Sequence, residues 1–366
     1  MSMTIINRLL AGAVAGLLAT GATIAPAAAV TSSFAELQGL LEAEHAAGMP
    51  GLVAEVRVGS AVWGGAAGVA DLRTGRPARP GLEHRIGSVT KTFVATTVLQ
   101  LVAERRVGLD VPVADYLPGV LPADLGARTT VRMLLGHYSG IGDYPDGIFR
   151  TEADFEANRH RTFRPAELAA IGLAQPRTGE PGAAYHYSNT DYILAGMLVE
   201  KVTGHTVAAE VDRRILRPLR LGHTYFPGTR AGLRGPHDRA YVQMADGLPR
   251  DFTDYDMSWG WAAGAMVSTP HDVNVFYRAL LAGRLLPPAQ LAEMTTGTPN
   301  GLGLSYAALP CGPAWGHTGT VIGHSTYTFH LADGTRQVTL DENLIQYTAP
   351  GIAAARARFI VAALCG

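Results

Sequence analysis

The sequence predicts an α+β fold, in which strands from both ends of the chain form one antiparallel β-sheet and a mostly helical lobe is inserted between them. Strand patterns occur at 51–70 and 301–343 and are scarce between 110 and 250. Short helical patterns separated by Pro/Gly loops fill that middle region. Helical patterns at 32–47 and 350–363 predict N- and C-terminal helices that flank the sheet.

The individual elements follow from local patterns in chain order. The helix at 32–47 begins after Ser32 or Ser33, either of which can cap it, and strands follow in GLVAEVRVG and AVWGGAAGVA. A further helix begins at Thr90 and closes at Gly108. The middle region contributes helices in VRMLLGH, FRPAELAAIGLAQ and NTDYILAGMLVEKVTG. The last part adds the helix PHDVNVFYRALLAG and strands in GLGLSYAAL, AWGHTGTVIG, STYTFHLA and RQVTLDEN.

This order predicts a sheet domain formed by 30–108 and 255–366 and an inserted, mostly helical domain at 109–254. Residues 1–29 look like a secretory signal peptide, because an arginine precedes a short apolar run that ends in an A-x-A pattern with cleavage after Ala29. A membrane anchor is the alternative, but the run is short and rich in Gly and Ala. We therefore expect a secreted protein, either extracellular or associated with the cell wall.

The composition is typical of a folded globular protein. Hydrophobic residues make up 47% and charged residues 17% of the 366 residues. The formal net charge is −1, so the chain has no basic field to attract nucleic acid or anionic lipid. No second apolar run of membrane-crossing length follows the signal peptide. We expect a monomer without nucleic-acid partners and without a membrane span in the mature chain.

Cys311 and Cys365 are the only two cysteines. In an oxidising compartment such a pair predicts a disulfide, and two buried free thiols are the alternative. The bond would hold the last helix against the segment before His317 and is typically worth about 2–4 kcal/mol. Two cysteines alone give no signature of a metal site.

Ser88 and Lys91 lie three residues apart at the start of a predicted helix, which stacks their side chains on one face. Lys91 is one of two lysines among 30 basic residues, the other being Lys201. Serine becomes a nucleophile when a base takes its proton, and a buried lysine, unlike an arginine, can itself lose a proton. In the structural alternative, Ser88 caps the helix and Lys91 points to water. Taken alone, the S-x-x-K pattern favours that alternative.

Tyr187 and Asn189 belong to a second motif, YSN, in a loop that enters a helix. A phenol near an ammonium is expected to have its pKa lowered by the positive charge and then to relay a proton. Asn189 can offer its amide to a substrate carbonyl. The alternatives are a core or turn tyrosine and an asparagine that caps the helix.

His317, Thr318 and Gly319 form a third motif, HTG, on a predicted strand. The glycine leaves one strand face clear, so that extended substrate backbone can pair with it. His317 would place a titratable group beside the nucleophile, and Thr318 a hydroxyl that can bind a carboxylate. The alternative for His317 is a packed core residue beside Trp315.

S-x-x-K, Y-x-N and H-T-G occur in this order on a helix start, a loop and a strand, which is the motif set of β-lactamases and penicillin-binding proteins. Most of the mature chain resembles the secreted serine D-Ala-D-Ala carboxypeptidases and transpeptidases of actinomycetes, which are relatives of class C β-lactamases and of similar esterases. The segments that carry the resemblance include RIGSVTKTF, DVPVADYLPG, VRMLLGHYSGI, GEPGAAYHYSNTDYILAGMLVEKVTGHTV and WGHTGTVIG.

The resemblance implies a role for each residue of the motifs. Ser88 is the acylated nucleophile, Lys91 is its base, and Tyr187 relays the proton to the leaving amine. His317 tunes and positions the site. The oxyanion hole consists of the backbone N–H groups of Ser88 and Thr320. The implied substrate-binding residues are Asn189, Thr318, Gly319, Thr320 and Trp259, the last of which walls the cleft. No metal or organic cofactor is implied.

Two departures from the family pattern put the substrate in question. An arginine that binds the terminal carboxylate of the peptide follows GLGL in these carboxypeptidases, and Ser305 stands there in this sequence. A polar residue tends to follow HTGTV, and here it is Ile322. Without a bidentate arginine, recognition of a free C-terminal carboxylate should weaken. Amidated peptides, esters and β-lactams become alternatives.

The leading hypothesis is therefore an exported D-alanyl-D-alanine carboxypeptidase or transpeptidase that acts on cell-wall peptides and is acylated by β-lactams. A β-lactamase or esterase with the same residues is the second hypothesis, which Ser305 favours. A penicillin- or muropeptide-binding protein without turnover is the third, and the intact motif set argues against it.

Overall fold

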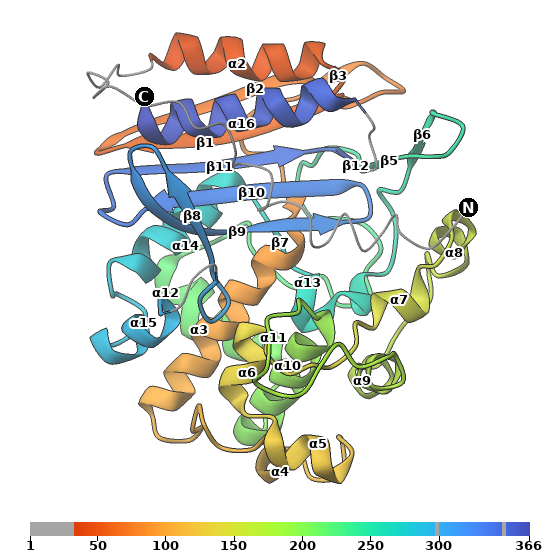
Figure 1. Ribbon diagram of the computed structural model, residues 1–366. Coiled ribbons are helices and arrows are strands. Elements are labelled where there is room, and N and C mark those ends of the chain that lie inside the picture. Colours follow the sequence, from red (N-terminus) through yellow and green to blue (C-terminus); the bar gives the residue numbers. More distant parts are fainter. Residues whose placement is uncertain (1–32, 297–299, 346–348) are drawn as a thin grey trace.

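The computed structural model of the protein describes residues 33–296, 300–345 and 349–366 (Figure 1). Its largest sheet has seven strands in the order β3-β2-β1-β11-β10-β9-β8, and all neighbouring pairs are antiparallel. This sheet and the surrounding helices confirm the predicted α+β fold. The predicted signal peptide, 1–29, lies outside the described residues, and the predicted domain boundaries stay a prediction.

Strands from the two ends of the chain meet at the centre of this sheet, where β1 pairs with β11. The strands of the sheet are β1 (Gly51–Val58), β2 (Ala61–Asp71), β3 (Arg76–Pro77), β8 (Ser305–Leu309), β9 (Gly312–Val321), β10 (His324–Leu331) and β11 (Arg336–Glu342). The shorter strands are β4 (His84–Arg85), β5 (Tyr241–Gln243), β6 (Pro249–Asp251), β7 (Val267–Ser268) and β12 (Leu344–Ile345).

Most of the regular elements between β4 and β8 are helices. The α-helices are α2 (Phe34–Ala46), α3 (Thr90–Ala103), α4 (Val113–Tyr116), α5 (Ala123–Arg128), α6 (Val131–Gly136), α7 (Pro145–Ile148), α8 (Glu152–Ala157), α9 (Pro165–Leu173), α10 (Asn189–Thr203), α11 (Val207–Val211), α12 (Arg217–Leu219), α13 (Trp261–Gly264), α14 (Pro270–Leu281), α15 (Pro288–Met294) and α16 (Pro350–Cys365). Short helical turns of other types are η1 (Gly87–Val89), η2 (Asp212–Leu216) and η3 (Met257–Trp259).

Two helices from opposite ends of the chain cover one face of the sheet. α2 and α16 lie side by side on that face (Figure 1). Leu37 of α2 and Phe359 of α16 are buried in the same apolar cluster as Val56 of β1 and Leu340 of β11. Full burial of such a side chain is worth about 1.5–3 kcal/mol, so this layer ties the two chain ends together.

The second large core contains α3 and α14, and α14 contacts β1 and β11. Phe93 of α3 stacks on Phe276 of α14, with ring centroids 3.7 Å apart. α3 is buried along most of its length, because its sequence TKTFVATTVLQLVA offers small or apolar residues on nearly every side. The N-terminal end of α3, which carries Lys91, is therefore held in the interior.

The structure contains short strands that the sequence analysis missed. β5 and β6 form a hairpin within the predicted helical region, and β12 pairs with β5 in parallel. Two or three residues are too few to display the alternating pattern that reveals a strand. The predicted disulfide is confirmed, because Cys311 and Cys365 are bonded. None of the described helices is long and apolar enough to span a membrane.

Candidate active site

Ser88 lies in η1, a single tight turn that leads directly into α3. The turn begins with Gly87 at φ +52°, a left-handed conformation that glycine adopts at little cost. A Cβ atom at Gly87 would lie 2.7 Å from the backbone nitrogen of Thr320 in β9. Glycine is therefore required for both the turn and the close approach of η1 to β9.

Lys91 makes three polar contacts through its Nζ atom, and the side chain is fully buried. Nζ lies 3.0 Å from Ser88 Oγ and donates to Asn189 Oδ1 and to the carbonyl oxygen of Ala263, each at 2.7 Å. The carbonyl oxygens of Asn189 and Ala263 each accept one N–H group of Lys91. In the neutral amine the remaining lone pair therefore points to Ser88, which is the arrangement of a general base.

The orientation of the Asn189 amide follows from its other contact. Its Nδ2 donates to Asp143 Oδ2 at 3.0 Å, and its backbone N–H donates to Asp143 Oδ1 at 2.8 Å. Because a carboxylate only accepts, the oxygen of the Asn189 amide must face Lys91. One hydrogen of the Asn189 amide is therefore bonded to Asp143. Donation of the second hydrogen to a substrate carbonyl stays a prediction.

Burial lowers the pKa of Lys91 to about 7, although the carboxylates of Asp143 and Asp191 act in the opposite direction. Burial also raises the pKa of Asp143 to about 7. The low-dielectric surroundings favour the neutral forms of both groups. At neutral pH a substantial fraction of Lys91 is therefore the free amine.

Tyr187 donates a hydrogen bond from its hydroxyl to Ser88 Oγ at 2.8 Å. The expectation that a neighbouring ammonium lowers the pKa of this phenol is wrong. Burial raises the pKa of Tyr187 well above its ordinary value, and the hydrogen bond to Ser88 only partly offsets the effect. Burial destabilises the phenolate more than the hydrogen bond to Ser88 stabilises it, so Tyr187 stays protonated and acts as a donor.

The segment His317–Val321 of β9 carries the third motif and lies next to η1. β8 pairs with β9 only as far as Gly316, so the following residues are not covered by that strand. A Cβ atom at Gly319 would overlap the carbonyl oxygen of Ile86 and lie 3.0 Å from the backbone nitrogen of Ser88. The glycine of HTG therefore allows β9 to approach the nucleophile.

Thr318 and Thr320 are half-buried and flank Gly319. The close approaches at Gly87 and Gly319 bring the backbone of Thr320 to the turn that holds Ser88. Ser88 and Thr320 are the two residues whose N–H groups were predicted to bind an oxyanion. The roles of both threonines stay predictions.

His317 is buried, and its Nδ1 donates to the carbonyl oxygen of Thr318 at 2.5 Å. Burial, with the charge of Lys91, lowers the pKa of His317 to about 4. The ring is therefore neutral at neutral pH, with Nε2 as an acceptor. The charge of Lys91 acts on this ring, and the role of His317 in tuning the site stays a prediction.

Trp259 lies in η3, just before the helix α13 that supplies the Ala263 carbonyl. Its ring is 9% exposed and packs edge-on against Phe149, and its own carbonyl accepts from Tyr144 at 2.5 Å. Its Nε1 is buried and has no hydrogen-bond partner among the described residues. The structure thus places Trp259 in the core close to the site, and its role as a cleft wall stays a prediction.

Four polar residues behind the motifs were not predicted from the sequence. His137 packs its ring 4.3 Å from that of Tyr187, and its Nδ1 lies 3.2 Å from Asp191 Oδ2. Ser139 donates to the other oxygen of Asp191 at 2.5 Å. Asp143 is the fourth such residue. Nothing in their spacing distinguishes them from other polar residues, although Asp191 follows YSN by two positions.

The position of the expected carboxylate-binding arginine is occupied by a buried serine. Ser305 begins β8 opposite Gly316 of β9 and is 8% exposed. Ile322 is buried in the turn that follows β9. One departure from the family pattern therefore lies on the strand paired with β9, and the other directly follows β9.

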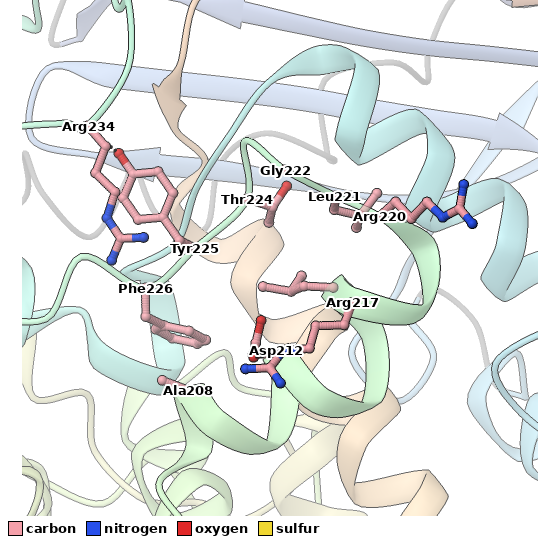
Figure 2. Close-up of a pocket in the computed structure, with 11 residues that line it drawn as sticks. Ala208, Asp212, Arg217, Arg220, Leu221, Gly222, Thr224, Tyr225, Phe226 and Arg234 are labelled. Atoms are coloured by element: carbon pink, nitrogen blue, oxygen red, sulfur yellow. Dashed lines mark hydrogen bonds and ion pairs between the residues drawn. The ribbon is translucent and has the colours of Figure 1, made fainter.

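A separate surface pocket of about 590 Å³ lies between η2, α12 and the segment 220–226 (Figure 2). Arg217, Arg220 and Arg234 are among the side chains that line it, and Arg217 pairs with Asp212 at 2.6 Å. None of the predicted site residues lines this pocket. It is therefore distinct from the cluster around Ser88.

Known protein families and structures resemble this chain over most of its length. A family model described as Beta-lactamase matches residues 34–355. The structure of a D-stereospecific amidohydrolase from Streptomyces sp. is 39% identical with a TM-score of 0.79, covering 86% of this chain and 95% of that chain. A D-amino acid amidase from Ochrobactrum anthropi SV3 is 28% identical with a TM-score of 0.79, covering 89% and 97%.

Among curated proteins, the Esterase EstB of Burkholderia gladioli is 35% identical over 181 residues, which are 44% of this chain and 43% of the esterase. The chain spans about half the length of the curated relatives it matches. The family match covers far more than half of the chain and includes the Ser88, Tyr187 and His317 motifs. The chain therefore belongs to the Beta-lactamase family, as a serine hydrolase.

Proposed function

We propose that this protein is an exported serine amidohydrolase that cleaves amide or peptide bonds next to D-amino acid residues through an acyl-enzyme on Ser88. The observation that carries the chemistry is Lys91, whose amine is buried, faces two carbonyl acceptors and contacts the serine hydroxyl. The D-stereospecific amidohydrolase and D-amino acid amidase relatives support the substrate class.

Acylation begins when Ser88 Oγ attacks the substrate carbonyl carbon and passes its proton to the Lys91 amine. The oxyanion that forms is stabilised by the N–H groups of Ser88 and Thr320. Tyr187, which is protonated before the reaction, gives its hydroxyl proton to the leaving nitrogen as the C–N bond breaks. The proton on Lys91 then restores the Tyr187 hydroxyl, since both groups contact Ser88 Oγ.

Deacylation follows the same route in reverse, with water in place of the leaving amine. The Tyr187 and Lys91 pair takes a proton from the water, whose oxygen attacks the ester carbon. The C–Oγ bond breaks, Ser88 regains its proton, and a carboxylic acid leaves. No metal ion or organic cofactor takes part in these steps.

The buried serine at position 305 supports a substrate whose C-terminus is an amide. A free carboxylate binds best to a bidentate arginine, and Ser305 cannot supply that contact. A D-alanyl-D-alanine carboxypeptidase or transpeptidase acting on cell-wall peptides is the second candidate, which the complete motif set supports. The esterase relative supports ester cleavage by the same acyl-enzyme.

The test compares four substrates with the mature protein and with Ser88→Ala. D-phenylalanine amide should release ammonia, L-phenylalanine amide should react far more slowly, and Ser88→Ala should be inactive on both while folding normally. Release of D-alanine from an N-acylated D-Ala-D-Ala peptide at a higher rate would favour the carboxypeptidase. An intact-mass experiment with benzylpenicillin distinguishes a lasting adduct, typical of a penicillin-binding protein, from the turnover of a β-lactamase.

Activity of Ser88→Ala equal to that of the natural protein would overturn the proposal. Binding of the D-amino acid amide or of benzylpenicillin without any acyl-enzyme would favour a binding protein. Export and the monomeric state are separate predictions. N-terminal sequencing of the secreted protein should begin at Val30, and light scattering should give the mass of one chain.

A further inference from the structure

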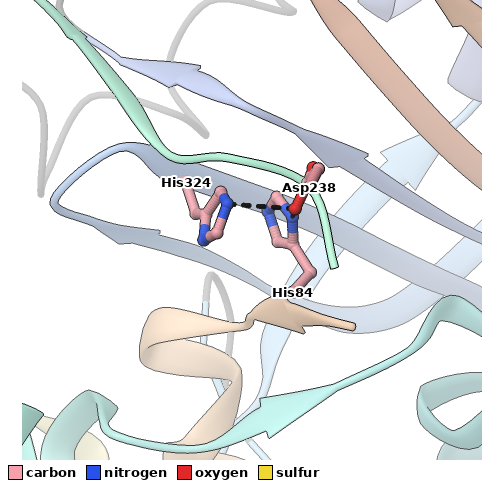
Figure 3. A group of neighbouring side chains, drawn as sticks. All are labelled: His84, Asp238 and His324. Atoms are coloured by element: carbon pink, nitrogen blue, oxygen red, sulfur yellow. Dashed lines mark hydrogen bonds and ion pairs between the residues drawn. The ribbon is translucent and has the colours of Figure 1, made fainter. Parts of the chain in front are cut away.

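Three buried polar side chains lie together behind the proposed oxyanion strand (Figure 3). His84 in β4 immediately precedes the turn of Ser88, His324 begins β10, and Asp238 comes from the loop before β5. The exposed fraction of each side chain is 3% or less. His84 Nδ1 lies 3.2 Å from Asp238 Oδ2, and His324 Nε2 lies 3.2 Å from Asp238 Oδ1.

The contacts of His84 define its protonation state. Its Nδ1 faces the Asp238 carboxylate, and its Nε2 lies 3.2 Å from the backbone carbonyl oxygen of Ser325. Both partners are acceptors, so both ring nitrogens must carry hydrogen. Burial lowers the pKa of His84, but Asp341 and Asp238 outweigh that effect and raise the pKa above its ordinary value. His84 is thus a buried imidazolium.

His324 is the neutral member of this cluster. Its Nδ1 accepts the backbone N–H of Arg85 at 3.3 Å, so that nitrogen carries no hydrogen and Nε2 carries the ring hydrogen. Nε2 lies within ion-pair distance of Asp238 but makes no hydrogen bond among the described residues. Burial lowers the pKa of His324 to about 3. The two rings lie with their centroids 3.7 Å apart. Asp341 and Arg85 are the other charged groups that act on these rings.

The hydrogens on the two rings argue against a metal ion among the three side chains, although their ligand atoms lie within 4.8 Å of one another. A metal ion would have to replace the hydrogens on His84 Nδ1 and His324 Nε2. His324 Nδ1 already accepts from Arg85, so a metal on Nε2 would leave the ring without any proton. Histidine ligands normally keep an N–H on the second nitrogen.

The cluster joins the two halves of the proposed oxyanion hole. His84 lies four residues before Ser88, and the Ser325 carbonyl that it contacts belongs to the residue paired with Thr320 across β9 and β10. His324 is paired with Val321 in the same hairpin and accepts from Arg85. Two contacts, His84 with Ser325 and Arg85 with His324, therefore join the chain segment before Ser88 to the hairpin that carries Thr320.

We propose that His84, held as an imidazolium by Asp238, is a positioning residue that fixes the β9–β10 hairpin relative to Ser88. It acts through the Thr320 backbone, and the inference rests on the proposed acyl-enzyme function. An oxyanion donor works only when it is fixed where the negative charge develops. Displacement of reacting groups by about 1 Å can cost on the order of 100-fold in rate.

The first test measures the protonation state of the natural protein, independently of activity. Nitrogen-15 NMR at pH 7 should show hydrogen on both ring nitrogens of His84, with signals that disappear in His84→Gln. A neutral His84 ring would overturn the proposal. Zinc or another metal bound in equal proportion to the purified protein would overturn it as well.

The second test measures acylation of Ser88 by p-nitrophenyl acetate, as the initial release of p-nitrophenol. This ester contains no D-amino acid, so acylation of Ser88 can be measured even if the protein does not cleave D-phenylalanine amide. His84→Leu should lower the acylation rate by about 10- to 100-fold. His84→Gln should recover part of the rate, because its amide can still donate to Ser325.

His330→Leu is the matched control. His330 is fully buried in the same strand as His324, but its ring contacts Thr328 and Tyr277, away from β4. This variant should lose stability and keep its acylation rate. Equal acylation by His84→Leu and the natural protein, or an equal loss in His330→Leu, would show that His84 has no positioning role.

Discussion

At the scale of single residues, Lys91 determines whether the proposed chemistry is possible. The chain uses arginine for 28 of its 30 basic residues, yet places a lysine in contact with Ser88. A guanidinium keeps its proton at every accessible pH and cannot act as a base. Lys91→Arg is therefore expected to lower the acylation rate by about 10²–10⁴-fold despite the unchanged charge. The measurement is p-nitrophenol release from p-nitrophenyl acetate.

Lys201 offers the natural control for that substitution. It is the other lysine of the chain and lies exposed in the last turn of α10. Lys201→Arg should acylate at the rate of the natural protein. If Lys91→Arg does so too, another group must take the proton from Ser88.

The pH dependence of acylation follows from the same residue. Burial lowers the pKa of Lys91 to about 7, and the base must be unprotonated to accept the serine proton. The acylation rate should therefore rise with pH through about 7 and level off above it. Asp143 titrates in the same range, so the apparent pKa belongs to the pair. Rates measured from pH 5 to 9 that show no rise near 7 would contradict this interpretation.

At the scale of elements, the approach of β9 to η1 depends on glycine. A Cβ atom at Gly319 would overlap the Ile86 carbonyl oxygen, which belongs to the backbone and cannot rotate away. Gly319→Ala should therefore separate the strand from the turn and lower the acylation rate by at least about 10-fold. Gly179→Ala is a suitable control, because no atom lies within 4 Å of the added methyl group. An unchanged acylation rate in Gly319→Ala would show that β9 can move away from η1 without lowering the rate.

The elements themselves differ in how well the sequence predicts them. α10 and the strands β9, β10 and β11 have enough residues to show a helical or alternating pattern. The two-residue strands β4 and β7 do not, although β4 contains His84. Their pairing depends on tertiary contacts between segments far apart in the chain, which no local pattern contains.

At the scale of the whole molecule, the disulfide fixes the end of α16 to the start of β9. Cys311 and Cys365 are 54 residues apart in sequence. Replacing both by alanine should lower the free energy of unfolding by about 2–5 kcal/mol, as measured by urea denaturation. The acylation rate of the folded variant should be unchanged, because the bond lies at the opposite end of β9 from Thr318 and Thr320. A lower acylation rate in the variant without the disulfide would show that this bond affects the site at the other end of β9.

The sequence by itself determined the α+β fold, the disulfide and the three motifs predicted to form the site, because each can be recognised from residue type and from the order of residues along the chain. Only the tertiary structure decided the protonation of the site. Burial, which sequence does not display, favours the neutral form of Lys91 and keeps Tyr187 protonated. Folding also brought Asp143 to Asn189 and Asp238 to His84. Such pairings depend on how distant loops pack, and so they are visible only when the chain is folded.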